Sequence, residues 1–171
     1  NNINQDDERI VFVGTHSPVE LHVYDLSGNH TGPNSDGDVD LQIPDSDYEI
    51  IGHNNFAILP DGDYRIVVDA TDSGEFDLEI ETYANLVSEN KITYINVPVA
   101  NGNSVASVDY TSPTGDLTLA MDSDGDGAVD EEVQPNAVLD SSTASDITPP
   151  EISFNIQNEV VTNSNVAIDF T

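Results

Sequence analysis

Residues 75–82 read E-F-D-L-E-I-E-T, and this segment decides the fold class. Its three apolar residues, Phe76, Leu78 and Ile80, alternate strictly with acidic residues. Successive side chains of a β-strand point to opposite faces of the sheet, so this alternation gives one apolar face and one acidic face. The segment therefore predicts a strand of an antiparallel sheet, with its apolar face in the core and its acidic face in water.

The same alternation recurs in six other segments. No segment carries the apolar spacing of an amphipathic helix over three turns, so no substantial helix is expected. Short strands separated by turns rich in Gly, Asp and Asn predict an all-β fold, an antiparallel β-sandwich of the immunoglobulin-like or jelly-roll-like type. The six segments are centred on Val19/Leu21/Val23, Tyr64/Ile66/Val68, Ala106/Val108/Tyr110, Leu117/Leu119/Met121, Ile152/Phe154/Ile156 and Val166/Ile168/Phe170.

Three turns lie between neighbouring predicted strands, at residues 60–63 (PDGD), 70–74 (ATDSG) and 101–103 (NGN). Such turn residues between alternating segments indicate hairpins, in which consecutive strands pair in one sheet. In the first of these turns, Gly62 is expected to supply a positive φ.

The charge balance excludes several classes of partner. The chain has 171 residues, with 33 Asp+Glu against 3 Lys+Arg and a formal net charge of −30. Three cations cannot neutralise a run of phosphates, so neither nucleic acid nor an anionic membrane surface is an expected partner. No apolar run approaches the ~20 residues of a membrane span, and the first ten residues do not read as a signal peptide. The absence of cysteine excludes disulfides and Cys-ligated zinc.

Composition divides the chain into four parts. Residues 1–9 form a polar lead, and residues 10–139 hold the predicted sandwich, either as one unit or as two small sandwiches divided near residues 84–91. Residues 140–150 (DSSTASDITPP) have the composition of a linker. Residues 151–171 hold two predicted strands, too few to be stable alone. We expect them to pair with the main body or a second chain, or to begin a further domain.

The strongest site motif lies in residues 121–132, which read M-D-S-D-G-D-G-A-V-D-E-E. Asp122, Asp124 and Asp126, followed by Gly127, match D-x-D-x-D-G, the first half of an EF-hand-type calcium loop. Alternate carboxylates converge in such a loop because the glycine turns the backbone sharply. Calcium takes about six to eight oxygen ligands, and we therefore expect Ca²⁺ as the cofactor.

The remaining ligands of this loop follow from their positions. The carbonyl of Ala128 and the carboxylate of Asp130, the latter through water, are the next expected ligands. Val129 is expected to anchor the loop to the core. The twelfth position of the motif is Val133, whose side chain cannot act as a ligand. Three candidates therefore remain for the last ligand: Glu131, Glu132 and a more distant carboxylate.

A second, weaker candidate metal site lies at residues 34–40. Oxygen donors again occupy alternate positions, at Asn34, Asp36, Asp38 and Asp40. No glycine follows Asp38, so the sharp turn of the first motif is missing. An acidic surface loop is the competing interpretation.

Three resemblances to known families add to these patterns. The loop at residues 121–132 resembles the D-x-D-x-D-G loops of thrombospondin type 3 repeats and dockerins, and it follows a predicted strand rather than a helix. Residues 17–82, with Y-D-L-S-G, L-P-D-G-D-Y-R-I-V-V and G-E-F-D-L-E-I-E-T, resemble the pre-peptidase C-terminal domains, which are β-sandwich modules of secreted prokaryotic proteins. Residues 148–156 (TPPEISFNI) are similar to the opening of tandem immunoglobulin-like domains. These resemblances imply an accessory or stalk module without catalytic residues.

No constellation for catalysis or for zinc binding is evident in the sequence. The four histidines, His16, His22, His30 and His53, show no paired ligand spacing. A G-x-S-x-G elbow is absent, so no enzyme is expected. The chain has no Trp and few other aromatic residues, so it offers few side chains that could stack on a sugar ring.

The sequence therefore predicts a non-enzymatic, extracellular or cell-surface β-sandwich module stabilised by calcium. Its partners would be calcium and adjacent domains or further copies of the chain, and residues 151–171 could be donated as strands to a neighbour to build a filament. The alternative is a carbohydrate-binding accessory domain of a secreted hydrolase.

Overall fold

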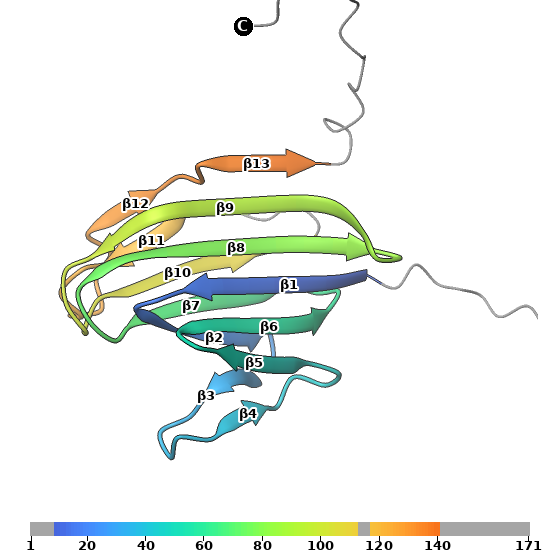
Figure 1. The fold of residues 1–171 in the computed structure, drawn as a ribbon, viewed down its shortest axis with the longest axis horizontal. Helices are drawn as coiled ribbons and strands as arrows, with labels where there is room; N and C mark the ends of the chain where they lie inside the picture. The colour runs from blue at the N-terminus through green and yellow to red at the C-terminus, as the bar shows by residue number, and fades with distance from the viewer. Residues whose placement is uncertain (1–8, 113–116, 141–171) are drawn as a thin grey trace, which may run out of the picture.

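The structure, a computed structural model, describes residues 9–112 and 117–140. These residues contain no helix and form thirteen strands in two antiparallel sheets that pack face to face (Figure 1). The predicted all-β antiparallel sandwich is therefore confirmed. The parts of the expected linker beyond Asp140, and all of residues 151–171, lie outside the described residues.

The first sheet, sheet A, has the strand order β13-β9-β8-β1-β6-β5, and the second, sheet B, has the order β12-β11-β10-β7-β2-β3-β4. Strand β10, which follows residues 84–91, pairs with β7, which precedes them, so sheet B runs across that boundary. The strands are β1 (Arg9–His16), β2 (Val19–Asp25), β3 (His30–Pro33), β4 (Val39–Leu41), β5 (Asp47–Ile51), β6 (Asn54–Pro60), β7 (Tyr64–Ala70), β8 (Gly74–Ala84), β9 (Val87–Val99), β10 (Val105–Tyr110), β11 (Leu119–Asp122), β12 (Glu131–Val133) and β13 (Ala137–Asp140).

The core lies between the two sheets and consists of the apolar positions that alternate along the strands. Phe76, Leu78 and Ile80 of β8 are all buried, as residues 75–82 predict. The inward positions predicted for β2, β7, β10 and β11 are buried as well, and Leu117 packs against the core from its edge. The period of two thus identifies the buried face of each of these strands correctly.

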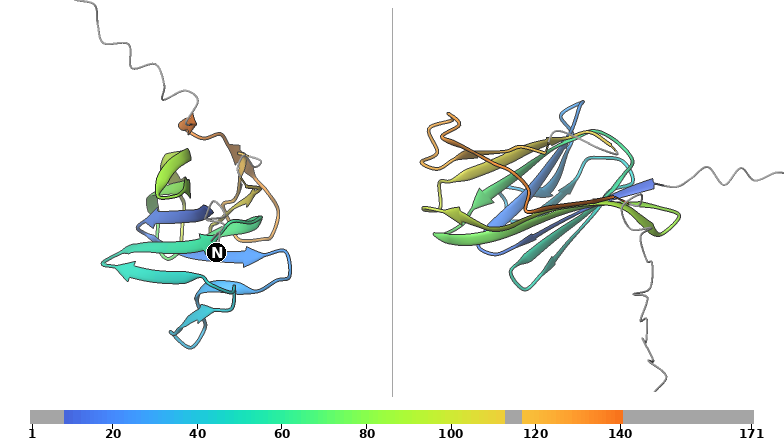
Figure 2. Two further views of the ribbon diagram at one scale, coloured as in Figure 1. Left: turned by 90° about the vertical axis from the view of Figure 1, so that its right-hand side faces the viewer. Right: turned by 90° about the horizontal axis from the view of Figure 1, so that it is seen from above.

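The three predicted hairpins are wrong. Strands β6 and β7, on either side of the PDGD turn, lie in different sheets, and the same holds for β7 and β8 and for β9 and β10. Gly62 does not adopt a positive φ. At each of these turns the chain crosses from one layer to the other (Figure 2). Strands that face each other across a core show the same alternation as strands that pair side by side, so the pattern cannot distinguish them.

Hairpins form instead at other turns. Strands β8 and β9 pair over most of their length and are joined by Asn85 and Leu86, which both have positive φ, as tight hairpin turns require. Strands β5 and β6 pair around Gly52, at a φ of 67°. At one side of the sandwich, the outer strands of the two sheets are β5 in sheet A and β4 in sheet B.

Tyrosine hydroxyls connect the two sheets across the core. The hydroxyl of Tyr110 in β10 lies 2.6 Å from Oγ1 of Thr82 in β8, and the hydroxyl of Tyr48 in β5 donates to the carbonyl of Leu21 in β2 at 2.9 Å. A buried hydroxyl without a partner is costly, so each of these bonds favours the observed packing of one sheet on the other.

The outer face of sheet A carries the acidic residues of β8 as predicted, with one difference. Lys91 of β9 lies 2.6 Å from Glu79 and 3.7 Å from Glu81. Glu81 is only 8% exposed, so it is not in open water as its position in the alternation predicts. The three cations of the chain, Arg9, Arg65 and Lys91, each lie within 4 Å of a carboxylate and leave most of the acidic charge uncompensated.

Candidate metal centre

The D-x-D-x-D-G motif forms the loop between β11 and β12, at the outer edge of sheet B (Figure 1). The two strands pair from Leu119↔Val133 to Met121↔Glu131. The backbone N–H of Asp130 then donates to the carbonyl of Met121 at 2.8 Å, which closes the loop at its base. This short hairpin brings Asp122, the last residue of β11, next to Asp130, just before β12.

Three carboxylates of the loop converge on one point. One oxygen each of Asp122, Asp124 and Asp130 lie within 4.8 Å of one another. In the described part of the chain, this is the only group of three or more His, Cys, Asp or Glu side chains placed to hold one metal ion. Oxygen ligands in a flexible loop are the donor set that Ca²⁺ prefers, and the residues therefore fit this ion.

Backbone N–H groups hold the carboxylates in place. Gly125 and Gly127 donate to the two oxygens of Asp122 at 2.7 and 2.8 Å, and Ser123 donates to Asp130 at 2.8 Å. Partial burial raises the pKa of Asp122, but these backbone hydrogen bonds outweigh that effect, and the net pKa lies below its ordinary value. Asp122 is therefore ionised at neutral pH, as a calcium ligand must be.

The loop rests on the turn between β9 and β10, a contact that the sequence does not predict. The carbonyl of Ser123 accepts a hydrogen bond from the hydroxyl of Ser104 at 2.8 Å and a longer one from the amide of Asn101 at 3.4 Å. Gly125 lies so close to this turn that a Cβ added there would be 2.6 Å from the carbonyl oxygen of Asn103.

The two glycines of the loop allow a matched test of this packing. Both have positive φ, 79° at Gly125 and 89° at Gly127, but only Gly125 has a neighbour within 4 Å of an added Cβ. We expect Gly127→Ala to cost about 1–2 kcal/mol of stability through φ alone, and Gly125→Ala to cost distinctly more. Chemical denaturation of both variants checks this ranking; equal losses would mean that the loop does not pack on Asn103.

The predicted carboxylate ligands Asp126, Glu131 and Glu132 are not among the three carboxylates that converge. Asp126 accepts a hydrogen bond from the N–H of Ala128 at 2.8 Å. Glu131 and Glu132 lie in β12, opposite Met121 and Ala120, and both are exposed. Asp130 belongs directly to the group of converging carboxylates, whereas the motif predicts that it acts through water.

The prediction that Val129 anchors the loop is wrong, since its side chain is 59% exposed. In the described part of the chain, β12 is the outermost strand of sheet B, so the loop lies at the edge of the sheet. The backbone bond from Asp130 to Met121 and the contact with Ser104 hold the loop instead.

The second candidate site is a compact turn between β3 and β4. The side-chain oxygen of Asn34 accepts the N–H groups of Asp36 and Asp38 at 3.0 and 3.1 Å, and its amide donates to Asp40 at 2.9 Å. The oxygen of Asn34 and one oxygen of Asp40 are thus engaged within the turn. The other oxygen of Asp40 faces His30, which connects this turn to a histidine pair that the sequence does not predict.

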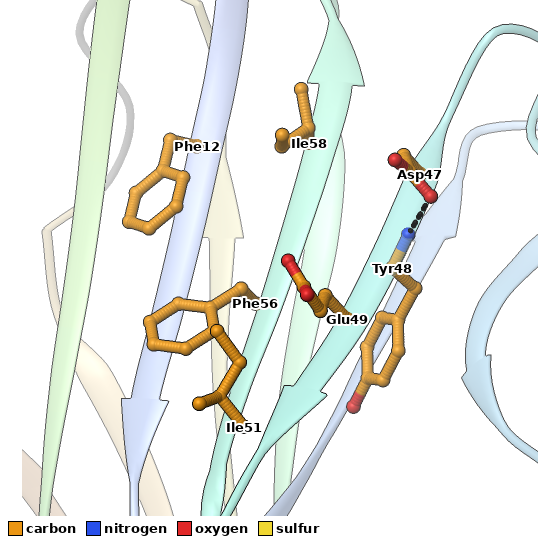
Figure 3. Close-up of a pocket in the computed structure, with 7 residues that line it drawn as sticks. All are labelled: Phe12, Asp47, Tyr48, Glu49, Ile51, Phe56 and Ile58. Carbon is orange, nitrogen blue, oxygen red and sulfur yellow. Dashed lines mark hydrogen bonds between the residues drawn. The ribbon is translucent and has the colours of Figure 1, made fainter.

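A separate apolar pocket of about 280 Å³ lies on the outer face of sheet A (Figure 3). The rings of Phe12 in β1 and Phe56 in β6 form its floor, with centroids 5.8 Å apart, and both lie close to Gly14. Ile51 and Ile58 add to the apolar surface, and Glu49 extends over it from β5. The sequence gives little indication of this pocket, because its aromatic residues come from strands that are distant in the chain.

The described part of the chain contains no helix long and apolar enough to cross a membrane. Comparisons of the chain with protein-family models, with curated proteins and with solved structures found no match. A function for the chain is therefore inferred from the geometry of its candidate sites.

Proposed function

We propose that the protein is a non-enzymatic, extracellular structural module of a cell-surface or secreted protein, stabilised by Ca²⁺ bound in the β11–β12 loop. The observation that carries this proposal is the convergence of Asp122, Asp124 and Asp130 within 4.8 Å, in a loop whose sequence matches a calcium motif. Extracellular calcium modules bind with dissociation constants of about 10⁻⁴–10⁻³ M, a range suited to structural rather than signalling sites.

The mechanism is linkage between binding and folding. Three carboxylates held this close repel one another, in a chain that already carries a net charge of −30. An ion between them removes this repulsion and joins both ends of the loop, at Asp122 and Asp130. Because the unfolded chain does not hold these groups together, the ion binds the folded state preferentially and stabilises it.

Isothermal titration with Ca²⁺ tests the proposal. We expect one saturable site in the wild-type chain and at least a tenfold loss of affinity in Asp124→Asn, which removes one charged ligand with little change of shape. Asp72→Asn is the matched control, because it removes the same charge from an exposed turn outside the cluster. Equal affinity in all three proteins would contradict the proposal.

Assembly through strand addition is a second element of the proposal. Strand β5 is one of the two outer strands of sheet A, and it exposes Ile50 and Ile51, at 53% and 54%. Residues 151–171 of a second copy, which the sequence predicts to hold two strands, would pair with this edge. Sedimentation of the full chain with and without Ca²⁺ tests this: concentration-dependent growth supports assembly, and a monomer in both conditions contradicts it.

The alternative function is carbohydrate binding, and the Phe12–Phe56 pocket favours it. Aromatic faces with a nearby carboxylate, here Glu49, suit the apolar face and the hydroxyls of a sugar ring (Figure 3). A glycan array probed with the wild type and with Phe56→Ala distinguishes the two functions. A glycan bound by the wild type and lost in the variant would favour this alternative, whereas an array without binding counts against it.

A further inference from the structure

The two sheets do not end together at the side formed by β5 and β4. Between the layers, β6 contacts β2, and β5 contacts β3 and β4, to which residues 42–46 connect it. In the described part of the chain, β5 is the last strand of sheet A at this side, whereas sheet B continues from β3 to β4. Figure 1 accordingly shows β3 and β4 below β5. Sheet B therefore extends beyond sheet A at this side.

Three apolar residues at this side point inward and are still exposed. Ile50 of β5 lies opposite the buried Asn55, so it points to the core side of sheet A, yet it is 53% exposed. Leu41 of β4 lies opposite the buried Thr31, so it points to the core side of sheet B, yet it is 52% exposed. Val39, two residues before Leu41 on the same face, is 39% exposed. We call Val39, Leu41 and Ile50 the uncovered strip.

A strand added beside β5 would cover the uncovered strip. It would take the next position of sheet A, about 4.8 Å from β5, and would there face β4. One of its faces would pack on the uncovered strip. Its other face would lie beside Asp47 and Glu49, which alternate with the inward residues of β5 and so point outward. Because like charges side by side on a sheet are destabilising, this outer face has to be polar without further acidic groups at its centre.

The sequence of residues 151–157, E-I-S-F-N-I-Q, meets both requirements. One face of a strand formed by this segment would be apolar, with Ile152, Phe154 and Ile156. The centre of its other face would hold Ser153 and Asn155, neither of which is charged. Residues 165–171 have a similar apolar alternation, but they would place the carboxylate of Asp169 beside the acidic residues of β5.

We propose that residues 151–157 of a second copy pair antiparallel with β5, with Phe154 opposite Ile50 and the apolar face on the uncovered strip. This inference rests on the assembly element of the proposed function, and it assigns the donated strand, its register and its acceptor. The antiparallel direction agrees with every strand pair of the two sheets in the described part of the chain.

The route of the chain favours a second copy over the same copy. Strand β13, which ends at Asp140, is the outer strand of sheet A at the side opposite to β5. A path back to β5 of the same copy would run about 24 Å across the outer face of sheet A, past the acidic residues Glu79 and Glu81. Residues 141–150 carry Asp146 and no cation, so this path is repulsive. Because donor and acceptor lie at opposite sides of the sheet, donation to a second copy repeats head to tail and builds a filament.

A disulfide between two engineered cysteines tests the contact, since the chain has no cysteine of its own. In the proposed register Asn155 of one copy lies opposite Glu49 of the next, with Cβ atoms about 4.5–5.5 Å apart. A chain with Glu49→Cys is mixed with a chain with Asn155→Cys and oxidised at saturating Ca²⁺. The mixture contains ~1 M NaCl, which screens the repulsion between copies of net charge −30.

We expect the disulfide between the two chains to form at least tenfold faster than with Glu75→Cys in place of Glu49→Cys. Glu75 is the matched control, because it is an exposed acidic residue on the outer face of the same sheet, in β8 rather than at the edge. Adding Phe154→Glu to the Asn155→Cys chain should slow the reaction at least tenfold. Adding Phe170→Glu instead, which changes the other predicted strand, should leave the rate unchanged.

Three results would overturn this inference. The first is a rate no faster than that of the Glu75→Cys control, and the second is an equal loss in Phe154→Glu and Phe170→Glu. The third is a disulfide formed within single, diluted chains that carry both Glu49→Cys and Asn155→Cys, because the same copy would then fill its own edge. Growth in sedimentation without the disulfide between Glu49→Cys and Asn155→Cys would overturn this contact alone and leave assembly standing. Calcium titration tests the loop independently of all these results.

Discussion

Replacing Phe76 by alanine is expected to lower the free energy of unfolding by about 3–5 kcal/mol, the range for removal of a buried aromatic side chain. Phe76 is 1% exposed and is one of the largest fully buried side chains. It projects from β8, which pairs with β1 on one side and β9 on the other, so the surrounding strands cannot close over the cavity.

Urea denaturation at a fixed Ca²⁺ concentration measures this effect, because a bound ion would otherwise change the stability of both proteins. Glu75→Ala is the matched control, as the neighbouring residue of β8 with an exposed side chain, and it should change stability by no more than about 0.5 kcal/mol. A loss below about 1 kcal/mol in Phe76→Ala would mean that the two sheets do not pack as described.

Saturating Ca²⁺ is expected to raise the melting temperature by roughly 5–10 °C relative to the chelated protein. A ligand at a hundredfold excess over its Kd stabilises the folded state by about 2.7 kcal/mol. For a chain of this size, each kcal/mol shifts the melting temperature by about 2–4 °C. The change should be absent in Asp124→Asn and present in Asp72→Asn.

General screening of the −30 charge has to be separated from binding at the loop. NaCl at the same ionic strength screens every acidic residue and should raise the melting temperature of both variants equally. Mg²⁺ demands a more rigid octahedral site and should stabilise less than Ca²⁺. If NaCl or Mg²⁺ reproduces the whole effect of Ca²⁺, the stabilisation is not due to a calcium site.

The sequence indicates which face of each strand is buried, but it does not indicate which strands pair with one another. Phe76, Leu78 and Ile80 could be placed in the core because the period of two is a local property of the chain. Whether β7 pairs with β8 or faces it across the core is decided by the packing of both sheets, which no turn sequence such as ATDSG specifies. The turn at Asn85 and Leu86 illustrates the same limit, because Leu86 is an unusual residue at positive φ.

The features of the candidate sites also fall into two kinds: those that follow from local spacing in the sequence, and those that depend on which strands pair. The spacing of the D-x-D-x-D-G motif predicts that Asp122 and Asp124 converge, but it predicts Asp126 as the third carboxylate, whereas the structure brings Asp130 to that place. The contact of Gly125 with Asn103, and the exposure of Val129, depend on which strands form the edge of sheet B. His22 and His30 are eight residues apart on two strands, and only the pairing of β2 with β3 brings them together.

The most direct test of the central claim is anomalous scattering from crystals of the protein grown with Ca²⁺. The account predicts one calcium ion in the β11–β12 loop, coordinated by Asp122, Asp124 and Asp130. An anomalous peak bound elsewhere, or no peak at this loop at saturating Ca²⁺, would contradict it.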